Sequence, residues 1–394
     1  MRLDPRRPAE GFAARGRPPA PGTVTIDRLE VRILSLPLVR HFETSFGRSY
    51  HRTFLIATVH GDGLEGWGES VADENPFYSS ETTETVWHVL TGFLAPLVLG
   101  RRFGHPRDVF PALARVRGHH MAKAVLEMAV WDLYARQQGV PLWQVLGGSG
   151  SPVVSGVSIG IQDSLDELVE RVAAEREAGY RRVKIKIKPG WDIAAVERLR
   201  TEFGDIPLMV DANAAYTIDD APHLAELDRF GLMMIEQPLD YDDLQDHAIL
   251  QRQITTPICL DESITSARVA RRAMDTGACR IINIKPGRLG GHAESVRVHD
   301  LADARGVPVW HGGMLESGIG RAHNLHLSTL PNFRLPGDIA ASRRYYDPDL
   351  IDPPVEVAAD GTVAVPADGP GIGVRVVADR VERATLRRTE MTAS

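Results

Sequence analysis

The chain has 394 residues, of which 43% are hydrophobic and 25% are charged, and its formal net charge is -7. No run of the sequence approaches the roughly 18 consecutive apolar residues that a membrane span needs, and no basic patch interleaved with aromatic residues suggests a nucleic-acid partner. The two cysteines, Cys259 and Cys279, imply no disulfide framework, so the composition favours a cytoplasmic enzyme that acts on a small molecule.

The N-terminal part of the chain predicts an extension followed by antiparallel strands. Residues 1–22 are rich in Arg, Pro and Ala and lack the continuous apolar segment of a signal peptide, so we expect them to be disordered. Between residues 23 and 60, apolar and polar residues alternate in two runs separated by the polar stretch HFETSFGRSY. This pattern predicts two antiparallel strands joined by a polar loop, which is not a βα unit.

A helical region follows these strands. After a short strand that ends in GWGES, the sequence predicts a loop and then the start of a helix, with Ser79, Ser80 and Thr82 as candidate caps. The segment HHMAKAVLEMAVWDLYARQQG has apolar residues at helical spacing and ends in Gly139. Because helices dominate up to about residue 145, we predict a first, smaller α+β domain over residues 23–145.

Five charged residues recur at nearly one spacing in the next part of the chain. Successive members are separated by 25, 25, 25 and 24 residues, which is about the length of one strand plus one helix of a (β/α)8 barrel. Each member lies at or near the end of a short apolar run, and that end of the strands forms the catalytic face of such a barrel. The five residues are Lys186, Asp211, Glu236, Asp261 and Lys285.

Further strand signals complete a barrel over residues 146–345. The run VVSGVSIGI predicts the first strand, VPVWHGGM the seventh and FRLPGDI a weak eighth. A barrel takes roughly 250 residues, so the chain is long enough for a barrel and a second domain. The tail, residues 346–394, has hairpin character with a DG turn, and we expect it to return to the first domain.

The strand period of two predicts which side chains point into the barrel. Lys184, Lys186 and Lys188 share one side of the run VKIKIK while the β-branched residues share the other, so we expect the lysines to point inward. The same parity places Asn213 on the side of Asp211. Unpaired charges inside a packed barrel would cost many kcal/mol, so these groups must pair with one another or hold an ion.

Three of the five residues are carboxylates on neighbouring strands. Asp211, Glu236 and Asp261 end the third, fourth and fifth predicted strands. Three oxygen ligands without His or Cys suit a hard cation such as Mg2+, with water and substrate oxygens completing the octahedron. For any one of them alone, a helix cap or a surface ion pair is the more common explanation. Together, at this spacing, they predict a magnesium site.

The two lysines lie four places apart in a ring of eight strands. Lys186 and Lys285 should therefore approach a bound substrate from opposite faces. Two bases across one carbon suggest racemisation, in which one lysine removes the proton α to a carboxylate, the other returns it, and a metal stabilises the enolate. Lysine titrates near 10.4 in free peptides, so we expect neighbouring cations to lower the pKa of one base. Lys184 and Arg288 are the candidate neighbours, with a solvated loop charge as the alternative for Arg288.

Six motifs carry a resemblance to a known family: KIKIKPGWD, VDANAAYT, IEQPL, LDESI, INIKPGRLGG and GGMLESGIGRAHN. They resemble the muconate-lactonizing subgroup of the enolase superfamily, and within it the o-succinylbenzoate synthase and N-acylamino acid racemase family, over essentially residues 23 to 390. The resemblance implies an α+β capping domain on a modified (β/α)7β barrel, a homo-oligomer, and Mg2+ as cofactor, for which Mn2+ or Co2+ can substitute.

The resemblance also assigns roles to single residues. Lys186 and Lys285 match the catalytic bases, and the three carboxylates match the Mg2+ ligands. The supporting residues that it implies are Lys184, Asn213, Arg288 and Glu262.

The resemblance indicates where a substrate binds. The segments TSFG and PFYSS look like the family's two capping-domain loops, with ordinary surface turns as the alternative. Ser158 matches an acyl-pocket position, although a strand-end cap would explain it equally well. His311 departs from the family, where a smaller residue is expected. We predict that it points inward, where it would narrow the substrate range or contact a succinyl carboxylate; a satisfied core residue is the alternative. The substrate-binding candidates are Ser45, Phe46, Tyr78, Ser158, His311, Gly312, Gly313 and Met314.

The leading hypothesis for function is Mg2+-dependent removal of the proton α to a carboxylate, used for racemisation of N-acylamino acids such as N-succinylamino acids, with or without o-succinylbenzoate synthesis. The paired bases and Arg288 favour the racemase. The enzymatic alternatives are an o-succinylbenzoate synthase only, a muconate-type cycloisomerase and a dipeptide epimerase. The alternative outside catalysis is an inactive barrel that binds a metal.

Overall fold

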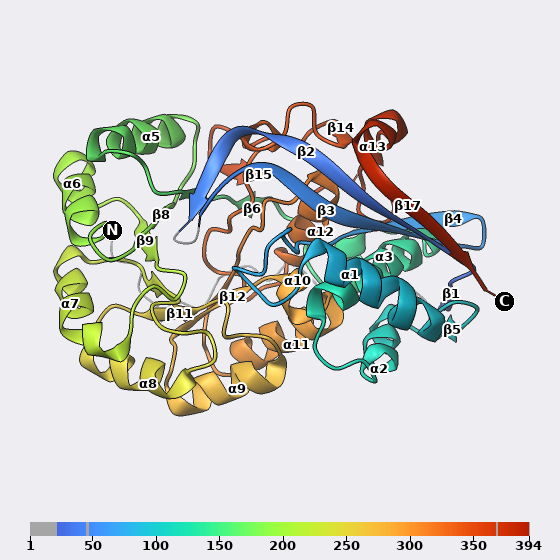
Figure 1. The fold of residues 1–394 in the computed structure, drawn as a ribbon, viewed down its shortest axis with the longest axis horizontal. Helices are drawn as coiled ribbons and strands as arrows, with labels where there is room; N and C mark the ends of the chain where they lie inside the picture. Colours follow the sequence, from blue (N-terminus) through green and yellow to red (C-terminus); the bar gives the residue numbers. More distant parts are fainter. Residues whose placement is uncertain (1–21, 45–46, 368, 394) are drawn as a thin grey trace.

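The computed structural model of the protein describes residues 22–44, 47–367 and 369–393. It shows a barrel of strands and helices beside an antiparallel sheet with its own helices (Figure 1). The candidates Ser45 and Phe46 lie outside the described residues, as do residues 1–21 of the predicted extension. In the described ranges, no helix combines the length and the apolar character needed to cross a bilayer.

Seven parallel strands form the barrel sheet, and strands that follow one another in sequence are neighbours in it. The strands are β7 (Val157–Ile159), β8 (Val183–Lys186), β9 (Leu208–Asp211), β10 (Ile235–Glu236), β11 (Ile258–Leu260), β12 (Ile281–Ile284) and β13 (Val309–His311). Helices cover the outside of this sheet (Figure 1). They are α5 (Leu165–Glu177), α6 (Ile193–Phe203), α7 (Ala221–Ala225), α8 (Leu244–Gln253), α9 (Ala267–Thr276), α11 (His292–Asp303) and α12 (Gly318–Leu327). The predicted barrel of strand–helix units is confirmed.

Side chains alternate between the two faces of the barrel strands as the period of two requires. Val183 and Ile185 of β8 belong to the large core outside the sheet. The ammonium of Lys184 instead lies 4.9 Å from the ring centre of Trp310, which belongs to a small cluster inside the barrel. The inward direction predicted for the lysines of β8 is therefore confirmed.

An irregular segment closes the barrel where an eighth strand was predicted. Single bridges join Phe333 to Val309 of β13 and Gly337 to Ser155 just before β7, and no regular strand occurs between these points in the described chain. Pro336 has no N–H to give to a ladder, and a glycine follows it, so the segment cannot hold a continuous pairing. FRLPGDI thus occupies the eighth position without being a strand.

The capping domain contains a four-stranded antiparallel sheet in the order β17-β2-β3-β4. Its strands are β2 (Arg28–Thr44), β3 (Gly47–Gly61), β4 (Leu64–Glu69) and β17 (Thr385–Thr392), and its main helices are α1 (Thr83–Val89) and α3 (His120–Gln137). The predicted polar loop over residues 41–50 is wrong, because β2 and β3 run through most of it. The stretch is polar because both faces of this ribbon are largely exposed. The predicted cap is found at Thr82, whose hydroxyl accepts a hydrogen bond from the N–H of Thr85.

The tail does not form the predicted hairpin with itself. The DG turn is present at Gly361, but the strand beside it, β15 (Thr362–Val363), pairs with β6 (Val153–Val154) at the start of the barrel. The next short strand, β16 (Arg375–Val376), pairs with β14 (Ile351–Asp352). After α13 (Ala378–Ala384), β17 adds to β2 in the capping sheet.

Two buried carboxylates of the capping domain hold helices of the barrel. Glu69 accepts hydrogen bonds from the N–H groups of Ser317 and Gly320 at the start of α12, at 2.8 and 2.9 Å. Glu127 accepts from the N–H groups of His292 and Ala293 at the start of α11, at 2.7 and 2.9 Å. Helix N-termini have unpaired N–H groups and favour negative charge, so these contacts fix the capping domain against the barrel.

Candidate active site

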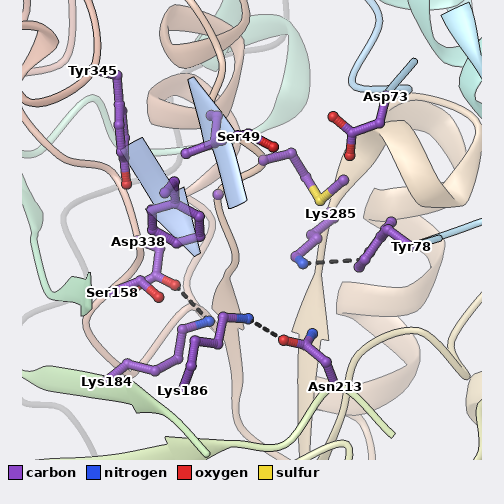
Figure 2. Close-up of a pocket in the computed structure, with 14 residues that line it drawn as sticks. Ser49, Asp73, Tyr78, Ser158, Lys184, Lys186, Asn213, Lys285, Asp338 and Tyr345 are labelled. Atoms are coloured by element: carbon purple, nitrogen blue, oxygen red, sulfur yellow. Dashed lines mark hydrogen bonds and ion pairs between the residues drawn. The ribbon is translucent and has the colours of Figure 1, made fainter. Parts of the chain in front are cut away.

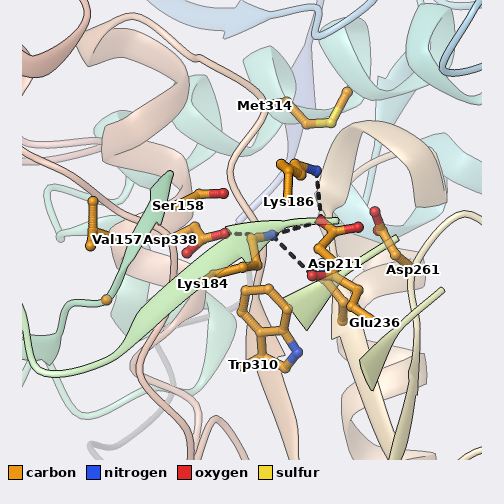
Figure 3. A network of polar contacts seen from close by, with 12 residues as sticks. Val157, Ser158, Lys184, Lys186, Asp211, Glu236, Asp261, Trp310, Met314 and Asp338 are labelled. Carbon is orange, nitrogen blue, oxygen red and sulfur yellow. Dashed lines mark hydrogen bonds and ion pairs between the residues drawn. The ribbon is translucent and has the colours of Figure 1, made fainter. Parts of the chain in front are cut away.

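The five periodic residues meet at the carboxyl ends of five successive barrel strands. Figure 3 shows four of them, Lys186, Asp211, Glu236 and Asp261, and Figure 2 shows Lys285. Lys186, Asp211 and Glu236 end β8, β9 and β10 and are paired across the sheet. Asp261 and Lys285 directly follow β11 and β12. All five side chains are buried. The three carboxylates therefore lie on the three strands between the two lysines.

Each carboxylate in this group is paired with a cation. The ammonium of Lys186 lies 2.6 Å from Oδ2 of Asp211, and that of Lys285 lies 2.7 Å from Oδ2 of Asp261. The ammonium of Lys184 lies 2.9 Å from Oε2 of Glu236 and 3.2 Å from the same oxygen of Asp211 that Lys186 contacts. Mutual pairing of the inward charges is the arrangement that their burial requires.

Tyr78 and Arg288 complete the surroundings of Lys285. The ammonium of Lys285 donates a hydrogen bond of 3.1 Å to the hydroxyl of Tyr78 and lies 4.8 Å from the centre of its ring. Arg288 is buried, forms an ion pair with Asp261 and donates to the carbonyl of Asn283 at 2.6 Å. The alternative of a solvated loop charge for Arg288 is therefore wrong.

The other two supporting candidates lie on the side of Lys186. Asn213 accepts a hydrogen bond from the ammonium of Lys186 at 2.5 Å and donates one of 2.8 Å to Glu262. Asn213 has a positive φ of 44°, which asparagine tolerates better than most residues. Burial, followed by the charge of Asp261, raises the pKa of Glu262 to about 8.

The charges of the site shift one another's pKa values. Burial raises the pKa of Asp211, but Lys186 and Lys184 outweigh it and hold that pKa well below the usual range. Burial lowers the pKa of Lys285, but Asp261 outweighs it, so this pKa lies above the ordinary lysine value despite the opposing charge of Arg288. The charge of Arg288 thus acts in the predicted direction on the pKa of Lys285, but the charge of Asp261 outweighs it.

The donor set of the three carboxylates fits Mg2+. All donors are oxygens, they lie on adjacent strands, and water is largely excluded from them. Burial and the charge of Asp211 raise the pKa of Glu236 to about 7, which marks a place where negative charge is crowded. Among the described residues, no three His, Cys, Asp or Glu side chains form a ready-made metal cage. In this arrangement Lys184, Lys285 and Arg288 form ion pairs with these carboxylates.

A pocket opens beside these charges between the barrel and the capping domain (Figure 2). Its empty space, solvent at the mouth included, is about 740 Å³. Four of the substrate-binding candidates line it: Tyr78, Ser158, Gly313 and Met314. The pocket therefore brings substrate candidates from both domains together with Lys186 and Lys285.

The inward direction predicted for His311 is wrong. Trp310 occupies the inward position of β13, so its neighbour His311 faces outward and its ring stacks on Phe333 with centres 6.0 Å apart. His311 lines a different cavity, on the outer side of the barrel beside Pro336. Burial lowers the pKa of His311 to about 3, so the side chain is neutral. His311 is not among the described residues that line the pocket of Lys186 and Lys285.

Sequence reasoning missed several residues of the pocket. The most important is Asp338, which forms an ion pair of 2.8 Å with Lys184. The sequence feature that could have identified Asp338 is its place near the end of a strand-like run, as at Asp211. The Pro-Gly pair in that run weakens the pattern that predicts a strand. Phe42, Ser49, Asp73 and Tyr345 also line the pocket. The first three come from the capping domain and Tyr345 comes from the irregular segment just before the tail, and the barrel period predicts the position of neither.

Gly312 acts on the site through its lack of a side chain. A Cβ atom at this position would lie 2.6 Å from Cε of Lys285 and 2.4 Å from the amide of Asn283. We expect Gly312→Ala to displace Lys285 and to lower turnover by about 100-fold, because misplacement of a catalytic group by about 1 Å has such a cost. Steady-state kinetics would measure the loss.

The matched control for this substitution is Gly92→Ala, since a Cβ atom at Gly92 would meet nothing within 4 Å. Gly92→Ala should leave turnover unchanged. A folded Gly312→Ala protein with normal turnover would show that Lys285 does not depend on this close approach.

Comparisons with known proteins give a consistent result. Residues 28–147 match the model of the mandelate racemase / muconate lactonizing enzyme N-terminal domain, and residues 167–380 match that of the enolase C-terminal domain-like family. A solved structure from Listeria innocua, described as a member of the enolase superfamily, is similar with a TM-score of 0.91 and 36% identity. The similarity covers 94% of this chain and all of that one.

Two curated relatives carry different names at nearly equal similarity. The chain is 53% identical to an o-succinylbenzoate synthase of Geobacillus kaustophilus, over 92% of this chain and 96% of that protein. It is 51% identical to an N-succinylamino acid racemase of Thermus thermophilus, over 94% of this chain and 100% of that protein. Similarity alone therefore does not choose between these two activities.

Proposed function

Because the chain belongs to the mandelate racemase / muconate lactonizing enzyme family of the enolase superfamily, among its o-succinylbenzoate synthases and N-succinylamino acid racemases, we propose that it racemises N-acylamino acids, with N-succinylamino acids as the leading class. The enzyme removes the proton α to a carboxylate and passes through an enolate. A single observation carries this proposal: two buried lysines flank one pocket, with three carboxylates between them.

The two lysines act as acid and base on opposite faces of the substrate. A neutral Lys186 or Lys285 takes the α-proton, depending on the hand of the substrate, and the other lysine, as an ammonium, returns a proton on its own face. Asp211 and Asn213 orient Lys186, while Asp261 and Tyr78 orient Lys285.

We assign Asp211, Glu236 and Asp261 as the ligands of Mg2+, with Mn2+ or Co2+ as substitutes. The ion supplies positive charge to the substrate carboxylate and so stabilises the negative charge of the enolate. As ligands of a cation, Asp211 and Asp261 would hold Lys186 and Lys285 less tightly, and the two lysines would be available to the substrate. Oxygen donors on adjacent strands support this assignment.

The pocket walls suggest how the substrate is held. Ser158 and Gly313 lie on the barrel side and Tyr78 on the capping side, so we place the acyl group and the α-carbon between them. Phe42, Met314 and Tyr345 offer apolar surface for the amino-acid side chain. By the family resemblance, Ser45 and Phe46 of the segment TSFG are further residues that we propose to contact the substrate. We further propose that the enzyme is a cytoplasmic homo-oligomer, by analogy with its family.

An o-succinylbenzoate synthase is the second candidate, since one relative at 53% identity carries that name. That dehydration uses the same α-proton, with Lys186 as base and acid on one face and Lys285 as a charge partner. Arg288 beside Lys285 and the two-sided placement of the lysines favour the racemase.

The test is polarimetry of N-succinyl-L-phenylalanine with the full chain and MgCl2. We expect the rotation to decay to zero and EDTA to stop the decay. Constant rotation, with formation of the aromatic product from the dehydration substrate, would move the assignment to the synthase. Mg2+ binding without either reaction would favour the barrel that only binds a metal.

A further inference from the structure

Two buried cations lie side by side inside the barrel, two residues apart in the sequence. Arg182 and Lys184 are 1% and 3% exposed, and both lie over the ring of Trp310, at 5.0 and 4.9 Å from its centre. Like charges at this depth are unfavourable unless an anion compensates them. The aromatic face supplies only part of that compensation.

Asp338 is the anion that bridges these two cations. Its Oδ1 lies 2.7 Å from Arg182 and its Oδ2 lies 2.8 Å from the ammonium of Lys184, and its side chain is 7% exposed. Its backbone N–H donates to the carbonyl of His311 at 2.8 Å. A Cβ atom at Gly313 would lie 2.5 Å from the carbonyl of Asp338, so a glycine there allows the segment to approach.

Lys184 connects Asp338 to the proposed metal ligands and to one base (Figure 3). Besides Asp338, its ammonium contacts Glu236 at 2.9 Å and Oδ2 of Asp211 at 3.2 Å. Lys186 contacts that same Oδ2 at 2.6 Å. A change in the position of Lys184 therefore changes the surroundings of two carboxylates and of Lys186 at once.

We infer that Asp338 is a positioning residue: it shares the ammonium of Lys184 with Asp211 and Glu236, and so weakens the competition of this ammonium with a divalent cation for those two carboxylates. Without the negative charge of Asp338, these two carboxylates are the anionic partners left to Lys184 among the described residues, and its ammonium competes with the cation for them. This inference rests on the proposed function, because it takes Asp211 and Glu236 as ligands.

Calorimetric titration of the full chain with MgCl2 alone tests the inference without any substrate. Asp338→Asn keeps the shape of the side chain and removes its charge. We expect the Kd for Mg2+ to rise by about 10- to 100-fold, the range found when partners of metal ligands are lost. The Mg2+ concentration for half-maximal turnover should rise by the same factor. An unchanged Kd would overturn the inference.

A double variant separates positioning from simple charge balance. Asp338→Asn with Arg182→Gln removes one anion and one cation, so the net charge of the interior is unchanged. The double variant can therefore be measured even if the single variant folds poorly. We expect its Mg2+ affinity to stay weak, because Lys184 still lacks its third partner. Recovery of the wild-type Kd would show that Asp338 only balances charge, which would overturn the inference.

Asp303→Asn is the matched control, because Asp303 pairs with Arg334 at 3.1 Å on the surface. It should leave the Kd unchanged. The outcomes also separate the two proposals. A wild-type chain that binds Mg2+ but does not act on substrate contradicts the proposed reaction alone. Equal Kd values for the wild type and Asp338→Asn contradict the role of Asp338 alone. A wild-type chain that binds no Mg2+ contradicts both proposals.

Discussion

Lys285→Ala is expected to abolish racemisation while the chain stays folded. A positioned acid or base contributes about 10²- to 10⁴-fold to a proton transfer, and racemisation needs both lysines in every turnover. The fold should survive because Asp261 keeps its ion pair with Arg288. Lys186→Ala should behave alike, since Asp211 keeps Lys184 at 3.2 Å. Polarimetry measures the rate and circular dichroism the fold.

The two variants should also differ from each other in the substrate enantiomer whose α-proton they still exchange, whereas two unfolded proteins would exchange neither. With one lysine left, the enantiomer whose α-proton faces that lysine can still exchange its proton with retention of configuration. Lys186→Ala and Lys285→Ala should therefore retain exchange with opposite hands of the substrate. Lys188→Ala is the control, because Lys188 does not line the pocket in the described part of the chain. Near-normal racemisation by either active-site variant would refute the two-base mechanism.

Glu236→Gln is expected to weaken Mg2+ binding and activity together, each by at least about 100-fold. Glu236 lies on the middle strand of the three that carry the proposed ligands, and its side chain is fully buried. The substitution removes a charged oxygen donor and leaves an amide that binds hard cations weakly. Asn283, which donates to Oε1 of Glu236 at 2.6 Å, can keep that contact with glutamine.

Titration of activity and of heat with MgCl2 measures both effects of Glu236→Gln. Raising the Mg2+ concentration should recover part of the activity, because the other two carboxylates remain. Glu202→Gln is the matched control, since Glu202 pairs with Arg198 on the surface of α6. A Mg2+ titration that is the same in the wild type and in Glu236→Gln would remove Glu236 from the ligand set.

The sequence was sufficient to bring together the residues at the ends of regular strands. The five periodic charges were predictable because one strand–helix unit has a nearly fixed length and parallel strands end at one face. The side of β8 on which Lys184 lies was predictable because its strand alternates β-branched and lysine residues without interruption. These signals are local, so a single sequence contains them.

The residues that were missed depend on irregular or distant pairing. Asp338 follows a Pro-Gly pair, so neither a regular period nor a strand end marks its direction. His311 was assigned to the wrong face because a shift of one residue reverses every side chain of a strand, and Trp310 takes the inward place. The tail strands β15 and β17 pair with segments more than 200 residues away, and no local pattern specifies such partners.

Proton NMR of N-succinyl-phenylalanine with the enzyme and Mg2+ in D2O tests the central claim most directly, when the α-proton signal and the optical rotation are followed together for both hands of the substrate. We expect the α-proton signal to disappear as the rotation falls to zero, and both changes to stop when EDTA removes the metal. An α-proton that persists with either hand, while the enzyme is folded and loaded with Mg2+, would contradict proton transfer between Lys186 and Lys285.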